Sequence, residues 1–503
     1  MKGERCGYIL KKIHFHELMK HLNLSGGDET KIQGVTQSHR EVKPGWLFLA
    51  KAGAHIHGGV FMEEVLRQGG VVLCEKREIL GKDALDHKKV VYCDRIDHYE
   101  AAILLALYGK VWEQVTLVGV SGTNGKSSVS HLIAQLWKEN QVPYLWIGTD
   151  GISFNGKQYP SERTTPCASK LFSLLDEALE QKITHVVMEV SSQAIMQGRC
   201  TLLRFDTVLL NSITSDHLDD HITKVQYRYT KFSLRWYLKE QGTMIVFHDS
   251  KEMKEIDQFK IPHLITVGEH GAHMQITPLS CTLKGSCFRL NDYLFQTPLI
   301  GAFQIHNLAM VIAYGRSIRL SYRLLQKQIP LLQRKGGRME LFRADEKMIL
   351  IDYAHTSSAL ASLLHDVKAL KEAKQRMITV FGCGGERDAS KRREMTQIAC
   401  AFSDVVIATS DNPRGEAPWQ ILMEMIAFPS FRGVVIENRQ FAIKYALTNA
   451  KKNDIILICG RGSEKVQLVK QERLPYCDKE TVLRILEGGF PCLSNMLYHS
   501  ESV

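Results

Sequence analysis

The chain reads GVSGTNGKSS from Gly119 to Ser128. An apolar run, Val115–Val120, leads into this segment, and the polar and apolar pattern of a helix follows from Ser127 to Glu139. A strand that ends in a glycine-rich loop at the start of a helix is typical of phosphate binding. Glycine lets backbone N–H groups approach phosphate oxygens, and the helix dipole favours anions. The pattern therefore predicts a nucleotide-binding α/β domain.

Two side chains of this loop are expected to act on the nucleotide directly. Lys126 places a positive charge on the β- and γ-phosphates, and Ser127 supplies a hydroxyl ligand for Mg²⁺. The alternative, a glycine-rich turn that binds nothing, is disfavoured by the strand and the helix on either side. The expected phosphate-binding residues are Gly122, Thr123, Asn124, Gly125, Lys126, Ser127 and Ser128.

Apolar runs alternate with helical segments on the carboxy-terminal side of the loop, and a second such series begins after residue 335. This alternation is typical of a mostly parallel, doubly wound sheet. Ligands of such sheets bind beyond the carboxyl ends of the strands, so the polar residues that close each strand are candidates for a site. The expected strands are 185–190, 207–211, 348–351, 377–381, 405–408 and 455–458.

Length and composition predict a globular protein. The chain has 503 residues, 44% of them hydrophobic and 23% charged. A single core rarely exceeds roughly 300 residues, so two to four domains are expected. Twelve cysteines without CxxC spacing predict reduced thiols. The charged residues 1–5 are followed by no apolar segment of the kind a signal peptide needs, and no apolar run reaches about 18 residues. Neither a signal peptide nor a membrane span is therefore expected, and the predicted location is cytoplasmic.

The net charge of +10 makes nucleic-acid binding a function to consider. The basic residues are dispersed, however, and interleaved with acids, as in the sequence KEMKE at 251–255. Such a surplus is more often a solvated surface, and it also attracts small anions such as nucleotides. The expected partners are small-molecule substrates, with no nucleic acid and no membrane, and the expected state is a monomer.

The segment GVSGTNGKS is narrower than a general phosphate loop and resembles the Mur ligase family, which shares a superfamily with the folylpolyglutamate synthetases. The resemblance implies a three-domain enzyme that uses ATP and Mg²⁺ to phosphorylate a carboxylate and then couples it to an amine. The implied domains are 1–110 for a uridine-nucleotide substrate, 111–333 for ATP, with a phosphate loop, and 334–503 for an amino acid, with a Rossmann-like fold.

Polar residues close two strands that follow the loop. Glu189 ends one of them, and Asp216 and His217 follow another, ahead of Tyr227 and Lys231. A carboxylate and an imidazole at neighbouring strand ends suit a second Mg²⁺, although each residue alone is more often an ordinary core or surface residue. The resemblance implies that Glu189 and His217 bind this ion and that Lys231 is N-carbamoylated and helps to hold it. With Lys126, these are the expected catalytic residues.

The resemblance also implies contacts with the muramoyl peptide and with the rest of ATP. The segment GAFQIHN at 301–307 matches a family pattern whose last residue, Asn307, would contact adenine. The segments GRME at 337–340 and DYAHT at 352–356 follow at the family's spacing. The implied ATP and hinge residues are Arg338, Asp352 and His355. The implied muramoyl-peptide residues are His39, Thr164, Thr165, Ser191, Gln197 and Arg199.

Two carboxy-terminal motifs separate members of the family. The segment DNPR at 411–414 resembles the motif of members that add meso-diaminopimelate, and GRGSE at 460–464 resembles a companion motif. A guanidinium suits the distal carboxylate of that amino acid, and a carboxylate suits its ammonium. The alternative is that Arg414 is a surface turn residue after Pro413. The residues expected to enclose the amino acid are Arg387, Asp411, Asn412, Arg414, Gly460 and Glu464.

The amino-terminal domain departs most from the family. Residues 38–40 read SHR where the family has DSR, and His57 stands where the family has Asp. Two hypotheses stay open: a ligase that adds the third residue of the peptidoglycan stem peptide, and a paralogue that couples a different carboxylate in secondary metabolism or poly-amino-acid synthesis. An NTPase that only hydrolyses nucleotide would need neither DNPR nor DYAHT. A nucleic-acid-binding module would cluster its basic residues.

Overall fold

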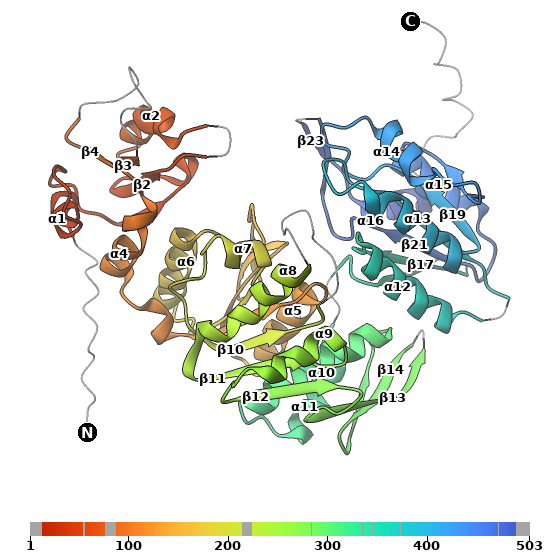
Figure 1. The fold of residues 1–503 in the computed structure, drawn as a ribbon. Helices are drawn as coiled ribbons and strands as arrows, with labels where there is room; N and C mark the ends of the chain where they lie inside the picture. Colours follow the sequence, from red (N-terminus) through yellow and green to blue (C-terminus); the bar gives the residue numbers. More distant parts are fainter. Residues whose placement is uncertain are drawn as a thin grey trace, which may run out of the picture. The chain divides into compact units, whose positions relative to one another are not determined.

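The structure is a computed structural model, and it confirms an α/β fold with mostly parallel strands (Figure 1). It forms two compact units. One contains the described residues up to Val120 with Asn140–Val208 and Ser233–Gly242, and the other contains Ser121–Glu139, Leu209–Phe232 and the described residues from Thr243 onward. The predicted three-domain boundaries stay a prediction. The structure describes residues 13–53, 56–75, 87–213, 224–282, 284–333, 336–344, 346–372, 374–470 and 472–488.

The amino-terminal sheet has four parallel strands in chain order, drawn in red and orange in Figure 1. Side chains of its second and third strands, including Phe48 and Val72, pack with Met62 and Val65 of a helix into a buried cluster. The elements are α1 (Phe15–His21), β1 (Gly34–Thr36), β2 (Trp46–Ala50), α2 (Met62–Arg67), β3 (Val71–Glu75), β4 (Val90–Cys93) and α4 (Asp97–Tyr108).

The central sheet has eleven strands in the order β15-β14-β13-β12-β11-β10-β5-β9-β6-β7-β8. Residue Val120 of β5 pairs with Glu189 of β9 in parallel register, so the end of β9 lies beside the start of the phosphate loop. The strands are β5 (Thr116–Ser121), β6 (Tyr144–Gly148), β7 (Gly151–Phe154), β8 (Lys157–Tyr159), β9 (His185–Glu189), β10 (Phe205–Leu210), β11 (Leu238–Phe247), β12 (Leu264–Gly268), β13 (Met274–Thr282), β14 (Gly285–Leu290) and β15 (Tyr293–Thr297).

One helix of this region was predicted from its polar and apolar pattern. The helix predicted over 127–139 is α5, which starts one residue earlier. The helices are α5 (Lys126–Glu139), α6 (Ala168–Glu180), α7 (Ser192–Met196), α8 (Lys224–Phe232), α9 (Lys251–Lys254), α10 (Ala302–Ser317) and α11 (Tyr322–Gln328). Short 3-10 helices are η1 (His39–Glu41), η2 (Gly58–Phe61), η4 (Val111–Gln114), η5 (Ser233–Tyr237), η6 (Glu255–Gln258) and η7 (Ile329–Leu331).

The carboxy-terminal sheet has the order β16-β17-β21-β18-β19-β20, and all its strands are parallel except β16. Its elements are β16 (Glu340–Ala344), β17 (Lys347–Asp352), α12 (Ser357–Leu370), β18 (Met377–Phe381), α13 (Ser390–Phe402), β19 (Val405–Ala408), α14 (Pro418–Met425), β20 (Val434–Val435), α15 (Arg439–Asn449), β21 (Ile455–Cys459) and α16 (Asp478–Leu486). A hairpin of β22 (Val466–Val469) and β23 (Glu472–Pro475) follows β21.

Both faces of this sheet are covered, because successive side chains of a strand point to opposite sides. Leu350 of β17 packs in a cluster with α12, α13 and α14, whereas its neighbours Ile349 and Ile351 pack in another with α15 and α16. The strands are therefore apolar throughout, which is why the sequence shows them as continuous apolar runs. In the part of the chain that the structure describes, no helix is long and apolar enough to cross a membrane.

A buried ion pair ties α15 to α16, and its loss is expected to destabilise the fold. Arg439 donates to both carboxylate oxygens of Asp478 at 2.8 Å, and both side chains are at most 1% exposed. Arg439→Ala would leave a buried carboxylate unpaired, which costs about 3–5 kcal/mol of unfolding free energy. Urea denaturation measures the change. The control Lys452→Ala breaks a solvent-exposed pair with Glu346 and should leave stability unchanged; equal losses would contradict the prediction.

Candidate active site

The phosphate loop is held in a shape that requires glycine. Gly122 and Gly125 have φ angles of 142° and 82°, in the region that L side chains rarely adopt. A Cβ on Gly125 would collide with the side chains of Asn211 and Asn307. The ammonium of Lys126 folds back over the loop, where it donates to the carbonyl oxygens of Gly122 and Thr123 at 3.0 Å. The structure thus fixes the shape of the loop, and its binding of phosphate stays a prediction.

Lys231 lies against this loop and is buried. Its side chain is 1% exposed, and Nζ donates to the carbonyl oxygen of Gly122 at 2.9 Å. Tyr227, one turn earlier on α8, places its ring 4.8 Å from Nζ and its hydroxyl 3.1 Å from Oγ1 of Thr123. Burial, and secondarily the charge of Lys126, hold the pKa of Lys231 well below its usual value. An uncharged amine is the form that reacts with carbon dioxide.

Glu189 is fully buried at the end of β9 and held by Thr149. The backbone N–H and the hydroxyl of Thr149 donate to the two carboxylate oxygens at 3.0 and 2.9 Å. The carbonyl oxygen of Glu189 accepts from Thr165 at 2.8 Å, and Thr165 also bonds to Ser191. Thr164 contacts Thr149 through their hydroxyls at 3.2 Å. The structure thus joins these residues in one network. Thr149 was not among the residues predicted from the sequence.

Arg199 belongs to the same network, and its hydrogen bonds go to neutral oxygens rather than to a carboxylate. Its guanidinium donates to the carbonyl oxygen of Thr165 at 2.9 Å and to the side-chain oxygen of Gln197 at 3.1 and 2.5 Å. It is 9% exposed, and burial lowers its pKa. A buried guanidinium held by neutral oxygens suits an anionic substrate group. Five of the six predicted muramoyl-peptide residues therefore lie together.

The structure also gives the surroundings of the other predicted residues in the first half of the chain. His39, the sixth of those residues, stacks on Phe61 with ring centroids 3.8 Å apart. His57 caps η2 by accepting a hydrogen bond from Gly59. Ser127 is 6% exposed in the first turn of α5. The predicted metal ligand His217 lies outside the described residues.

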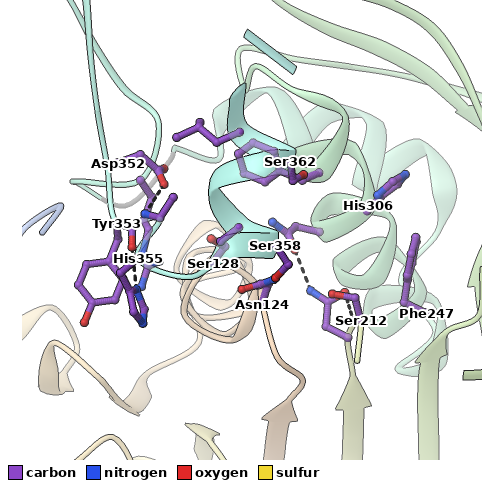
Figure 2. Close-up of a pocket in the computed structure, with 18 residues that line it drawn as sticks. Asn124, Ser128, Ser212, Phe247, His306, Asp352, Tyr353, His355, Ser358 and Ser362 are labelled. Atoms are coloured by element: carbon purple, nitrogen blue, oxygen red, sulfur yellow. Dashed lines mark hydrogen bonds between the residues drawn. The ribbon is translucent and has the colours of Figure 1, made fainter. Parts of the chain in front are cut away.

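A pocket of about 290 Å³ opens beside the phosphate loop (Figure 2). Phosphate-loop residues Asn124, Gly125 and Ser128 form one part of its lining, and residues from α10 and α12 form others. Asn124 donates to Ser358 of α12 at 3.4 Å. The predicted ATP residues Asn307, Arg338, Asp352 and His355 all line it. The other lining residues are Asn211, Ser212, Phe247, Phe303, His306, Tyr353, Ala354, Ser358, Ala359, Ser362 and Leu363.

The polar side of this pocket is built on the end of β17. The carboxylate of Asp352 accepts backbone hydrogen bonds from Met339 at 2.7 Å and Ala354 at 2.8 Å, while its burial raises its pKa. The guanidinium of Arg338 lies over the ring of Tyr353, 4.2 Å from the centroid. These contacts fix the turn after β17, whose residues Tyr353 and Ala354 line the pocket.

The predicted amino-acid residues also form a cluster. Asn412 donates to Glu464 at 3.0 Å, and Arg414 donates to the carbonyl oxygen of Gly385 at 2.7 Å. Burial lowers the pKa of Arg414, as does the positive charge of Arg387 nearby. Burial raises the pKa of Glu464, as does the neighbouring Asp411. Arg414 is therefore partly buried among polar groups, which is unlike a solvated turn residue. Gly460 has a φ of 114°, and a Cβ there would meet Asp411.

Arg461 supports this cluster and was missed by the sequence analysis. It is fully buried, donates to the side-chain oxygen of Asn412 at 2.8 Å, and lies 3.5 Å from a carboxylate oxygen of Glu464. Its other hydrogen bond, at 2.7 Å, goes to the carbonyl oxygen of Val466 in β22. The only available signal was its position between two motif glycines, at 460 and 462.

Comparison with known proteins gives concordant results over most of the chain. The model of the Mur ligase middle domain matches residues 120–315, and that of the Mur ligase glutamate ligase domain matches residues 337–462. The UDP-N-acetylmuramoyl-L-alanyl-D-glutamate–2,6-diaminopimelate ligase of Aquifex aeolicus is 33% identical over 92% of this chain and 95% of its own. The enzyme of that name from Rickettsia rickettsii is 32% identical over 92% and 97%.

Solved structures agree on the fold. A structure of UDP-N-acetylmuramoyl-L-alanyl-D-glutamate–2,6-diaminopimelate ligase, 27% identical, aligns with a TM-score of 0.62 over 95% of this chain and 99% of its own. The MurF ligase of Thermotoga maritima in complex with ADP aligns with a TM-score of 0.67 over 91% and 97%; at 18% identity it supports the fold alone.

Proposed function

Because the chain belongs to the Mur ligase family, we propose that it is an ATP-dependent ligase that adds meso-diaminopimelate to UDP-N-acetylmuramoyl-L-alanyl-D-glutamate in peptidoglycan precursor synthesis. The observation that carries the choice of amino acid is the cluster of Asn412, Arg414 and Glu464, which offers both a cation and a carboxylate. The relatives favour this function over a paralogue that couples a different carboxylate, since diaminopimelate ligases match more than nine-tenths of the chain.

The proposed reaction has two steps. The glutamyl carboxylate attacks the γ-phosphorus of ATP and ADP leaves; the amine of diaminopimelate then attacks the acyl carbon, phosphate leaves and a proton is released. Lys126 and the backbone N–H groups of the loop stabilise charge on the transferring phosphoryl group, which is where phosphoryl transfer gains most. Arg199 and its network are proposed to hold the muramoyl peptide, and Arg414, Asn412 and Glu464 the amino acid.

The proposed ligands of Mg²⁺ are Ser127, Glu189, His217 and carbamoylated Lys231. A hydroxyl, a carboxylate and a carbamate are hard oxygen donors, and they fit this ion. When bound, the ion would neutralise charge on the phosphates. An unmodified Lys231 would offer only an amine nitrogen, whereas Mg²⁺ prefers oxygen ligands, so carbamoylation is part of the proposal. A cytoplasmic location is also proposed, in keeping with the ten described cysteines, all of which are free thiols.

The test of this function is a screen of amino acids with purified protein, ATP and UDP-N-acetylmuramoyl-L-alanyl-D-glutamate, with products identified by mass. Release of phosphate should require both the acceptor and meso-diaminopimelate. Release without an amino acid would indicate an NTPase. Coupling only with another carboxylate acceptor would indicate the paralogue, with the altered residues His39 and His57 as the first place to look.

Lys231→Ala is expected to lose most ligase activity and to regain part of it with short carboxylic acids. The buried amine has a depressed pKa, which favours its proposed reaction with carbon dioxide to a carbamate, and a carboxylic acid can replace the oxygens of that carbamate. Activity with and without acetate or formate measures the rescue, and intact mass under bicarbonate measures the modification. Lys138→Ala, which removes an exposed lysine of α5, is the control, and acetate should leave its activity unchanged. A free amine in a fully active protein would contradict the prediction.

A further inference from the structure

One end of the pocket beside the phosphate loop is aromatic and carries a histidine. His306 of α10 and Phe247 at the end of β11 line the pocket together, with ring centroids 4.6 Å apart and planes inclined by 39°. Figure 2 shows both rings on one side, away from Asp352 and His355. Purine rings stack favourably on aromatic side chains, whereas phosphates belong at the loop. This end of the pocket is therefore suited to the base of the nucleotide.

Asn307, the neighbouring residue, already uses its amide within the protein. Its side-chain oxygen accepts a hydrogen bond from Asn211 at 2.9 Å, and its nitrogen lies 3.4 Å from the side-chain oxygen of Gln304. The residue is only 3% exposed. The amide is thus engaged within the protein, and His306 is the polar ring that lines the pocket beside Phe247.

Glu269 fixes the imidazole of His306. Nε2 of His306 lies 2.8 Å from a carboxylate oxygen of Glu269, and this hydrogen bond lowers the pKa of Glu269. Asp249 in turn accepts the backbone N–H of Glu269 at 2.8 and 2.9 Å. An ionised carboxylate can only accept, so Nε2 of His306 carries a hydrogen. In a neutral imidazole, Nδ1 is then an acceptor.

We propose that His306, positioned by Glu269, determines the choice of nucleotide base. Nδ1 accepts a hydrogen bond from the exocyclic amino group of adenine, and it opposes the carbonyl oxygen that guanine carries at the equivalent ring position. This inference rests on the proposed use of ATP and adds to it the group that reads the base. His306 is a specificity-determining residue, and Glu269 acts only through it.

The experiment measures binding of ADP and GDP to the full chain by titration calorimetry, which needs no ligation. The wild type should bind ADP more tightly. His306→Phe keeps the aromatic wall and removes the nitrogen, so the preference for ADP over GDP should fall about tenfold. Glu269→Leu should lower it similarly. Glu269→Gln retains an oxygen acceptor and should keep the preference within roughly threefold of wild type.

A second histidine–carboxylate pair supplies the matched control. Nε2 of His248 lies 2.9 Å from Asp257, and neither residue lines the pocket. Asp257→Leu should leave the preference unchanged. An unchanged preference in His306→Phe, or an equal fall in Asp257→Leu, would overturn the role of His306 but would leave the proposed function standing. Failure of the wild type to bind either nucleotide would overturn the proposed function as well.

Discussion

Lys126→Ala should reduce the rate of ligation by roughly a thousandfold or more, because loss of a charge-stabilising group in phosphoryl transfer costs orders of magnitude in rate. The ammonium lies over the loop, 3.0 Å from two of its carbonyl oxygens, where the β- and γ-phosphates of ATP are proposed to bind. Steady-state release of phosphate with both substrates present measures the effect. Circular dichroism and thermal unfolding should show that the variant is folded, because the lost hydrogen bonds go to a loop beside the pocket.

The control for this variant is Lys138→Ala, which removes an exposed lysine from the far end of the same helix. Its turnover should match that of the wild type. Near-normal turnover in folded Lys126→Ala would reject the phosphate loop as the site of ATP, and with it the proposed reaction.

Arg414→Ala should lower kcat/KM for meso-diaminopimelate by roughly a hundredfold, and the wild type should prefer that amino acid to L-lysine by a similar factor. The two amino acids differ at the distal carbon, where diaminopimelate has a carboxylate and lysine has a hydrogen. Two charge-assisted hydrogen bonds of about 1.5–3 kcal/mol each support discrimination of this size. Lysine should gain comparatively little from the substitution, because Asn412 and Glu464 still form the rest of the cluster.

Two further variants sharpen this test. Arg414→Lys keeps a positive charge but loses the planar fork, so most of the preference should disappear with it. Arg393→Ala removes an exposed arginine from α13 and should change neither kcat/KM. A wild-type preference for lysine, or an unchanged ratio in Arg414→Ala, would reject the role of Arg414. Residue 414 has a φ of 51°, and arginine and alanine both carry a Cβ there. The substitution Arg414→Ala therefore adds no new backbone strain.

Several buried parallel strands could be predicted from the sequence, although β6 was missed, and the strands exposed on one face could not be predicted. Residues 377–381 and 405–408 form β18 and β19 within the predicted bounds, since strands covered on both faces are apolar throughout. The strands β13, β14 and β15 were not predicted. Much of their surface is exposed, and a short alternating pattern with polar residues resembles a loop.

Site residues within a motif were predicted, but their partners elsewhere in the chain were not. The segment DNPR supplied Asn412, and the structure joins it to the predicted Glu464. Thr149, in contrast, meets Glu189 across 40 residues of sequence, and Glu269 meets His306 across 37. Such pairs depend on which strands lie side by side, and that order follows from packing rather than from any local pattern.

The hairpin of β22 and β23 is joined to the amino-acid cluster by its backbone. Leu468 donates its N–H to the side-chain oxygen of Asn412 at 2.8 Å and accepts the N–H of Arg414 at 3.0 Å. The position of the side chains proposed to bind the amino acid is therefore set partly by a surface hairpin whose strand β23 is exposed. Surface hairpins accept insertions and substitutions readily. If the proposed site is correct, evolution could change which diamino acid is accepted by altering this hairpin, while Asn412, Arg414 and Glu464 stay the same.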